Sequence, residues 1–201
     1  MARISLSKSS LAKQTKNLKT YEQFLPALDL KRKLIMSERA KEVRARAATE
    51  AAIAALRERV QTNLPMVSNR EIALDGLVGV RDATVGTENV VGTRLPRLDR
   101  LDVVRRDYGL MSLPHWVDPL CDALAEMLTL KAQLLVHEER LALLDAATRK
   151  VTQRVNLFGK VLIPQTEANI KLIKVYLSDA ERAAIVRSKI AKNKRQQEAA
   201  A

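Results

Sequence analysis

The chain has 201 residues, of which only 3% are aromatic, and glycine and proline each occur six times. Aromatic side chains supply much of the area of a globular core, so this composition favours an elongated protein over a compact one. The single cysteine, Cys121, excludes an internal disulfide framework. No apolar run reaches the ~18 residues that a membrane span requires. We therefore expect a soluble, cytoplasmic chain without direct membrane insertion.

The excess of positive charge lies at the two ends of the chain. The sequence carries 35 basic and 23 acidic residues, a net charge of +12. Residues 1–46 hold 12 basic and 4 acidic residues, and residues 171–201 hold 8 and 3, so the middle is close to neutral. A basic end can contact nucleic acid or an acidic protein surface, or it can be merely solvated. The basic segments lack the interleaved aromatic residues that stack on bases.

Residues 1–64 are predicted to form a helix with the repeat of a coiled coil. Apolar residues follow each other at steps of three and four; they are Leu11, Leu18, Tyr21, Leu25, Leu28 and Ile35. Pro26 predicts a kink or a break near Leu25, because proline removes one backbone hydrogen bond of a helix. After Ile35 the pattern changes phase and becomes rich in alanine, through Ala40, Val43, Ala47 and Ala51 and then Ile53, Leu56 and Val60.

Residues 65–117 have a different character, with most of the glycines and several short β-branched clusters. Turn residues between alternating apolar runs predict a small β-hairpin. A two-stranded ribbon alone is marginal in water, so we expect this insert to lean on the helices or on another protein of a complex.

Residues 118–195 are predicted to form a second long helix. Asp118 and Pro119 have the pattern of an N-cap followed by proline in the first turn. The apolar repeat then continues through Leu120, Ala123, Met127, Leu130, Leu134, His137, Leu141, Leu144, Thr148, Val151, Val155, Phe158 and Leu162. Beyond Pro164 it resumes in a new phase at Ile170, Ile173 and Leu177. Ser178 to Glu181 has the spacing of a capping box, but an exposed turn of a continuous helix is favoured; residues 196–201 are expected to be a frayed tail.

Two helices of roughly 80 and 110 Å, at ~1.5 Å per residue, can bury their apolar repeats on each other only as an antiparallel pair. The expected fold class is therefore all-α: a long two-helix coiled coil with a small β-hairpin insert. Pro26 and Pro164 lie on opposite arms, and we interpret them as marking a shared bend or bearing level.

The sequence contains no recognisable catalytic, metal-binding or cofactor-binding pattern. His115 and His137 lack further ligands at metal-site spacing, and His137 is interpreted as a polar residue that sets the register of the coiled coil. Asp99 and Asp102 are expected to be solvated. The glycines around residues 76–92 do not form a phosphate-binding motif. The chain is thus predicted to be mechanical and not an enzyme.

Three stretches of the sequence are distinctive: Leu-Asp-Leu-Lys-Arg-Lys-Leu at 28–34, Glu-Asn-Val-Val-Gly-Thr-Arg-Leu-Pro at 88–96, and Thr-Gln-Arg-Val-Asn-Leu-Phe-Gly-Lys-Val-Leu-Ile-Pro at 152–164. Together they resemble the D subunit of the V/A-type rotary ATPases in its bacterial form. The last is the most specific, although Leu157, Phe158 and Gly159 replace the usual Ala-Leu-Glu of that family. The signature segments of the F-type rotary shaft are not found.

The resemblance implies a central rotor stalk that transmits torque between the ATP-hydrolysing or ATP-synthesising hexamer and the membrane rotor ring. The implied partners are the catalytic and non-catalytic subunits of the hexamer, the F subunit, and a connector on the rotor ring; the implied location is cytoplasmic and peripheral to the membrane. Residues expected to contact the hexamer bore are Lys8, Lys13, Arg187, Lys189 and Lys192. A patch for the F subunit is expected at Leu56, Val60, Leu124 and Leu128, where extra leucines, Leu128, Leu135 and Leu143, widen the apolar stripe, although leucine is also simply a good helix former. The alternative is a basic coiled-coil scaffold or a nucleic-acid-binding protein.

Overall fold

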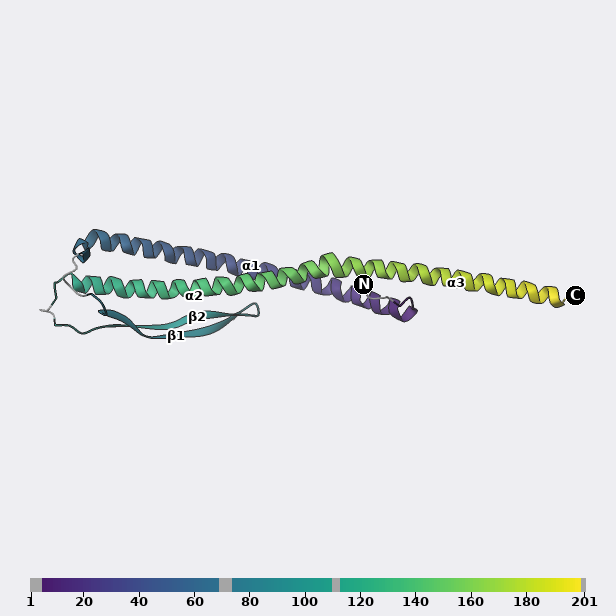
Figure 1. Cartoon of the computed structure of the whole chain (residues 1–201), viewed down its shortest axis with the longest axis horizontal. Helices are drawn as coiled ribbons and strands as arrows, with labels where there is room; N and C mark the ends of the chain where they lie inside the picture. The colour runs from purple at the N-terminus through teal and green to yellow at the C-terminus, as the bar shows by residue number, and fades with distance from the viewer. Residues whose placement is uncertain (1–4, 69–73, 110–112, 200–201) are drawn as a thin grey trace. The chain divides into compact units, whose positions relative to one another are not determined.

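The computed structural model describes residues 5–68, 74–109 and 113–199. In chain order its elements are helix α1 (Lys8–Asn63), a 3-10 turn (Pro65–Ser68), strands β1 (Val78–Val90) and β2 (Thr93–Arg105), helix α2 (Val117–Asn156), a π-helical stretch (Leu157–Leu162) and helix α3 (Ile163–Ala199) (Figure 1). The described chain is mostly helical and contains an antiparallel sheet of two strands. At this level the expected fold, long helices with a β-hairpin between them, is confirmed.

The chain divides into two compact units. Unit 1 consists of residues 1–30 and 151–201, and unit 2 consists of residues 31–150. Helix α1 contributes its first part to unit 1 and the rest to unit 2, while α2 lies almost wholly in unit 2. Each unit has its own buried side chains and can be described by itself.

In unit 2 the later part of α1 and most of α2 lie side by side and run in opposite directions (Figure 1). Arg39 forms an ion pair with Asp145, and Arg59 forms one with Glu126. The residue number on α2 falls as the number along α1 rises, which defines an antiparallel pair. The buried side chains of α1 recur at helical spacing and so share one face; they are Ile35, Thr49, Ile53 and Leu56.

The alanine-rich phase predicted for α1 after Ile35 is wrong. Ala40, Val43, Ala47 and Ala51 are exposed, and Val43 keeps 43% of its surface accessible. The packed face instead continues the register of Ile35 through Glu42 and Thr49 to Leu56. Polar residues can occupy these positions because each has partners: the Thr49 hydroxyl, for example, donates to the carbonyl of Ala45 at 3.1 Å. Hydrophobicity alone therefore indicated the opposite stripe of the helix.

Strands β1 and β2 form a hairpin closed by the two-residue turn Val91–Gly92. Both turn residues have positive φ, 53° and 77°, as the type I′ turn of a hairpin requires. The pairing shifts between Val80 and Asp82 and again between Thr84 and Val85. Strand β1 is almost entirely exposed, whereas β2 buries Leu95 and Pro96. The hairpin therefore turns β2 towards the helices, in agreement with Figure 1.

The base of the hairpin and the start of α2 share an apolar core. Its buried members are Leu77, Trp116, Val117, Leu120 and Cys121. The backbone N–H of Arg106 also donates to the carbonyl of Leu77 at 2.8 Å. We call these contacts the base anchor. Cys121 is fully buried, and the tyrosine that lies near it, Tyr108, packs against the same core.

Helix α2 begins at Val117, slightly earlier than the expected cap at Asp118. The N–H of Leu120 donates to the carbonyl of Trp116 at 3.3 Å, so Asp118 is already inside the first turn. Pro119 is tolerated there because the first N–H groups of a helix have no acceptor within the helix. The Asp118 side chain instead accepts a hydrogen bond from Tyr108, described below.

Unit 1 contains the first part of α1 packed against the end of α2 and α3. The rings of Tyr21 and Phe158 meet edge to face, with centroids 5.4 Å apart and planes at 88°. Lys8 Nζ lies 3.3 Å from a carboxylate oxygen of Glu181, so these helices also run antiparallel. Buried residues on the α2 and α3 side are Val151, Val155, Thr166, Ile170 and Ile173.

The two internal prolines have different effects. Helix α1 passes through Pro26 without a break, so the break that was one of the two expectations there does not occur. On the other arm the helix widens into π-helical turns at Leu157–Leu162, directly before Pro164. Proline cannot donate to the turn before it and its ring crowds that turn, and a π-helical insertion is one way to accommodate it. Leu25 lies against Gly159, 3.8 Å from where a Cβ would stand, so the irregular turn packs beside the residue that precedes Pro26.

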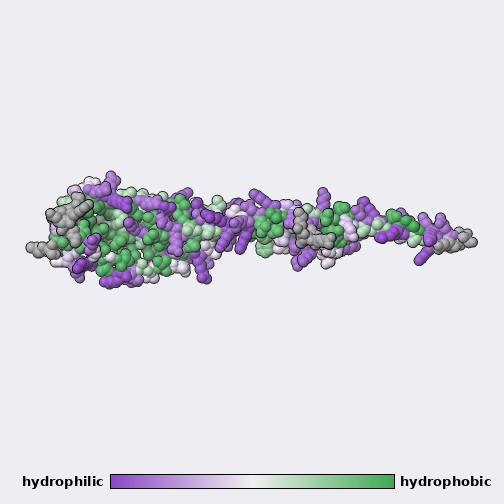
Figure 2. All heavy atoms as spheres, in the orientation of Figure 1, coloured by the Kyte–Doolittle hydropathy of each residue, from purple (hydrophilic) through white to green (hydrophobic). Residues whose placement is uncertain are grey.

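Helix α3 is continuous past Ser178 and reaches Ala199, which excludes a separate helix starting at the capping-box sequence. From residue 179 to 197 all its side chains are exposed. They include Ile185, Val186 and Ile190, at 56%, 55% and 62% exposure. Figure 2 shows hydrophobic side chains gathered over the helices and hairpin of unit 2, whereas hydrophobic and hydrophilic groups alternate along the C-terminal helix. Within the described residues, no helix is both long enough and apolar enough to cross a membrane.

Candidate functional site

The predicted seam residues lie at buried or half-buried positions. In unit 1 they are Leu11, Leu18, Tyr21, Leu25, Leu28, Val151, Val155, Phe158, Leu162, Ile170, Ile173 and Leu177, and in unit 2 they are Leu130, Leu134, Leu141 and Leu144. Leu144 and Ile173 are fully buried. These positions of the heptad repeat are thus packed or half-packed, in contrast to the exposed alanine-rich phase of α1.

The basic residues predicted to contact the hexamer are all in unit 1 and all exposed; they are Lys8, Lys13, Arg187, Lys189 and Lys192. Lys8 pairs with Glu181, and Arg187 Nε donates to the carbonyl of Ala183 at 3.2 Å. By sequence, unit 1 holds 15 basic and 6 acidic residues, and unit 2 holds 20 and 17. Three quarters of the net positive charge therefore belongs to unit 1.

The patch predicted to bind the F subunit overlaps an apolar groove in unit 2. The groove has a volume of about 430 Å³ and is lined by Leu56, Arg57, Val60, Gln61, Leu120, Ala123, Leu124 and Met127. Leu56 is only 3% exposed, so its side chain forms the floor of the groove, while Val60 and Leu124 are half-buried. Leu128 is half-buried but does not line the groove. A partner could therefore contact Val60 and Leu124 more readily than Leu56.

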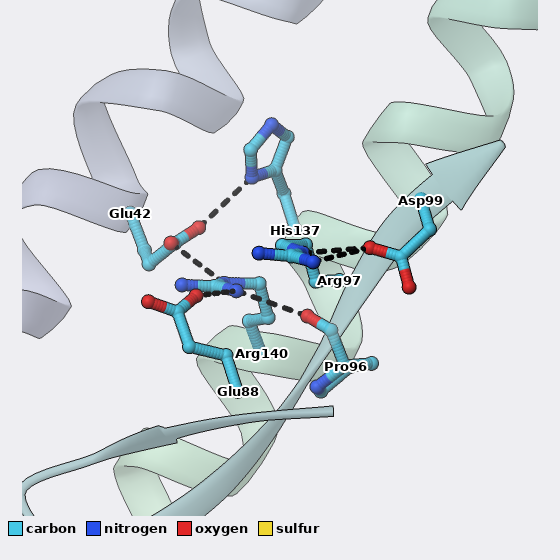
Figure 3. A network of polar contacts seen from close by, with 7 residues as sticks. All are labelled: Glu42, Glu88, Pro96, Arg97, Asp99, His137 and Arg140. Carbon is cyan, nitrogen blue, oxygen red and sulfur yellow. Dashed lines mark hydrogen bonds and ion pairs between the residues drawn. The ribbon is translucent and has the colours of Figure 1, made fainter. Parts of the chain in front are cut away.

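A cluster of polar side chains joins α1, α2 and the hairpin, and we call it the Arg140 hub (Figure 3). Arg140 Nε donates to Glu42 Oε1 on α1 at 2.7 Å. Its Nη1 donates to the carbonyl of Pro96 on β2 at 3.0 Å and to Glu88 on β1 at 3.5 Å. The side chains of Arg140 and Glu42 are only 13% exposed. One guanidinium group thus connects four segments of the fold, which charge-assisted hydrogen bonds hold in fixed geometry.

His137 completes this hub from the same helix as Arg140. Its Nδ1 lies 2.8 Å from Glu42 Oε2. A carboxylate can only accept, so Nδ1 carries the hydrogen whether the imidazole is neutral or protonated. The interpretation of His137 as a polar residue within the helix pair agrees with this geometry. Sequence reasoning missed Glu42 and Arg140; continuing the register of Ile35 by one heptad would have reached Glu42.

A polar hollow of about 360 Å³ lies beside the hub, lined in part by Arg97 and Gln133. Arg97 Nε donates to Asp99 Oδ1 at 2.7 Å. The Asp99 carboxylate lies over Gly86 and would contact a Cβ there. Asp102 also has a basic partner, Arg81, at 3.8 Å. The two aspartates expected to be solvated therefore belong to ion pairs of the hairpin.

Two further contacts shift side-chain ionisation. The Tyr108 hydroxyl donates to Asp118 Oδ1 at 2.5 Å and lies 3.8 Å from Cys121 Sγ. The hydrogen bond to Asp118, and next that to Cys121, raise the pKa of Tyr108. The hydrogen bond and charge of Asp145 raise the pKa of Arg39. Both contacts tie neighbouring segments of unit 2 together.

No group of three or more metal-ligating side chains comes together in the part of the chain that the structure describes. His115 is exposed and His137 is used in the hub. The polar side chains that the structure brings together here form ion pairs and hydrogen bonds.

Known proteins are similar to this chain over nearly its whole length. Residues 10–193 match the family described as the D subunit of ATP synthase. The chain belongs to the ATP synthase D-subunit family. The resemblance noted in the sequence is thereby confirmed.

Bacterial members of the D-subunit family give the same result. A protein of Borreliella burgdorferi named as the D subunit of a V-type ATP synthase is 31% identical over 193 residues, covering 96% of this chain and 95% of its own length. The proteins of the same name from Chlamydia muridarum and Chlamydia felis are 31% and 30% identical, covering 98% of this chain and 98% and 95% of theirs.

Two of the three stretches that resemble the D-subunit family include irregular parts of the fold, whereas the third, residues 28–34, lies within α1. Residues 88–96 run from one hub contact, Glu88, through the strained turn to another, Pro96. Residues 152–164 run from the end of α2 through the π-helical turns to Pro164.

Proposed function

We propose that this chain is the central rotor stalk of a V/A-type rotary ATPase and transmits torque between the ATPase hexamer and the membrane rotor ring. The observation that carries the proposal is the near full-length similarity to proteins named as the D subunit of V-type ATP synthases. In this role the chain performs no bond-making step itself. It belongs to a complex that is peripheral to the membrane on the cytoplasmic side.

The mechanical part of the proposal rests on helix packing. Within each unit the helical arms pair in antiparallel fashion along the seam residues. Twisting such a pair would unpack successive layers of close-packed side chains, so the seam resists torsion. Antiparallel contacts within each unit, Lys8 with Glu181 and Arg39 with Asp145, support this arrangement.

The proposed partners follow from charge and apolar surface. The basic residues of unit 1, with the bare end of α3, enter the bore of the hexamer formed by catalytic and non-catalytic subunits, where exposed lysines exchange acidic partners at each step. The F subunit binds over the groove at Val60 and Leu124, and the connector protein joins the stalk to the rotor ring. Support for this binding comes from the apolar lining of the groove.

Purification of the tagged chain from its native membrane tests the proposal. We expect the hexamer subunits, the F subunit and the connector in the eluate, identified by mass spectrometry, and none of them in the eluate from cells with an untagged chain. Recovery of the chain alone, or with nucleic acid released steeply by salt, would instead favour a basic scaffold.

A further inference from the structure

The hairpin of unit 2 is attached at both ends, but by different kinds of contact. Near its base, Leu77 belongs to the apolar core with Trp116 and Val117. Arg105 also forms an ion pair with Asp122 on α2. The base anchor therefore combines buried apolar area with ionic and backbone hydrogen bonds, and we expect it to open last.

Residues 84–98, which we call the tip half, are tied to the helices by the Arg140 hub. Arg140 Nη1 reaches both strands at once, through Glu88 and the Pro96 carbonyl. Strand β1 contributes almost no buried surface, while β2 buries Leu95 and Pro96. The closed position of the tip half thus depends on one guanidinium group and on a short apolar contact of β2.

The backbone between base and tip half is interrupted. The strand pairing shifts between Val80 and Asp82 and between Thr84 and Val85. Such bulges leave a residue unpaired, disturb the ladder and bend the bulged strand. A hairpin with two neighbouring interruptions bends there more easily than within either half.

The turn itself is strained. Val91 has φ of 53°, a left-handed conformation that a β-branched side chain rarely adopts. Strain of this kind persists only where surrounding contacts hold it and is found at parts of proteins that change conformation. Gly92, next to Val91, lies close to Lys31 of α1, whose Nζ is 3.3 Å from where a Cβ would stand.

We propose that the hairpin is a hinged arm: the tip half swings away from the helix pair about the two bulges when the contacts of Arg140 break, while the base anchor stays closed. The proposal rests on contacts within unit 2 and is independent of the proposed rotor function. Arg140 is then a positioning residue that sets how often the arm opens.

Hydrogen–deuterium exchange of the full chain with Arg140→Gln tests the hinge. We expect exchange in peptides covering residues 84–98 to become about tenfold faster or more, because two charge-assisted hydrogen bonds are lost. Peptides covering residues 77–80 and 102–106 should keep the rate of the unmodified chain. Equal acceleration over the whole hairpin, or none in the tip half, would overturn the proposal.

Two matched variants guard against a general loss of folding. Glu88→Gln weakens the contact of Arg140 with β1 and leaves its contact with Glu42 in place. It should therefore speed exchange by a few fold in the same peptides of the tip half that respond to Arg140→Gln. Arg105→Gln removes an ion pair at the base and should leave exchange in the tip half unchanged. A tip half that responds to Arg105→Gln as strongly as to Glu88→Gln contradicts a hinge between them.

Discussion

At the scale of single residues, Val91 shows how local strain is retained in this fold. It is held with a positive φ at the first position of a type I′ turn, where asparagine followed by glycine is the preferred pair. The half-buried valine gains some apolar contact at the cost of backbone strain. The hairpin is therefore less stable than its turn geometry would allow.

Replacing Val91 by asparagine should stabilise the chain by about 1 kcal/mol, because asparagine adopts left-handed backbone angles at much lower cost. Urea denaturation followed by circular dichroism measures the change. Val90→Asn is the matched control: Val90 is paired with Thr93 in the regular ladder, so the same substitution there should destabilise. A loss of stability on Val91→Asn would mean that the apolar contact outweighs the strain.

Tyr108 makes the stability of the fold depend on pH in the alkaline range. The pKa of Tyr108 is raised in the folded chain by its hydrogen bond to Asp118, so the folded state holds the phenolic proton more tightly than the unfolded state. Its contribution to stability is complete below the ordinary tyrosine pKa of about 10 and is lost as pH rises above it. Tyr108→Phe should lower the urea midpoint between pH 7 and 9, and its deficit should shrink above pH ~10.

Measuring the urea midpoint of both chains from pH 7 to 11 checks this sign. Asp118→Asn serves as the control, because it removes the carboxylate that raises the tyrosine pKa. In that background, the difference in urea midpoint between the chains with and without Tyr108→Phe should depend less on pH. A deficit that stays constant up to pH 11 would rule out the contact as its source.

At the scale of elements, the heptad pattern predicted the packed face of a helix correctly only where that face consists of apolar residues. The pattern placed Leu144 and Ile173 correctly at buried positions, yet it moved to the alanine stripe after Ile35 because Glu42 and Thr49 interrupt the packed face. The hub was missed because the partners of Arg140 lie on segments that are far apart in the sequence and meet only in the folded chain. The hairpin was predicted from its composition. The left-handed conformation of Val91 could not be predicted, because it contradicts the usual residue preferences of the turn.

Neighbouring residues of α3 test the packed face directly. Ile173 is fully buried while Leu172 keeps 55% of its surface exposed. Ile173→Ala should cost about 2–5 kcal/mol through lost packing and a cavity, and Leu172→Ala should change stability by less than ~0.5 kcal/mol. Thermal or urea denaturation of the isolated chain compares them, and similar costs for both would show that this face is not packed in solution.

Two glycines test the backbone of helix and hairpin with the same substitution. At Gly159 a new Cβ meets only Leu25 at ordinary contact distance, so Gly159→Ala should stabilise by about 0.5–1 kcal/mol through helix propensity. Gly92 has φ of 77°, and Gly92→Ala should destabilise by about 1–2 kcal/mol. Opposite signs in urea denaturation are expected; a loss at Gly159 would indicate that the π-helical turns need glycine.

At the scale of the whole molecule, the two units differ in net charge. Unit 1 holds 15 basic against 6 acidic residues, whereas unit 2 is close to balanced at 20 and 17. The exposed lysines of unit 1 need not stabilise the fold, because exposed ion pairs contribute little. Their accumulation is therefore consistent with the proposed contact with the ATPase hexamer.

Replacing Lys8, Lys13, Lys189 and Lys192 together by glutamine should lower the coupling between ATP hydrolysis and ion transport while leaving the melting temperature of the isolated chain nearly unchanged. Coupling is measured in membrane vesicles as ions moved per ATP hydrolysed. The control removes four exposed charges from unit 2 instead, at Lys33, Arg44, Lys131 and Arg149, and should preserve coupling. Normal coupling in the first variant would refute a role for the basic residues in the hexamer bore.

The exposed end of α3 has a consequence for how the chain acquires its final order. From residue 179 to 197 this helix buries no side chain of its own, and in proteins most helical stability comes from the packing of one face. Before assembly its helicity thus depends on backbone hydrogen bonds and on exposed contacts such as those of Arg182 with Asp179 and Lys8 with Glu181, while its exposed valine and isoleucines remain in contact with water. If the chain acts as the proposed stalk, we expect these last turns to become fully ordered only in the complex, so that an unassembled copy is degraded more easily.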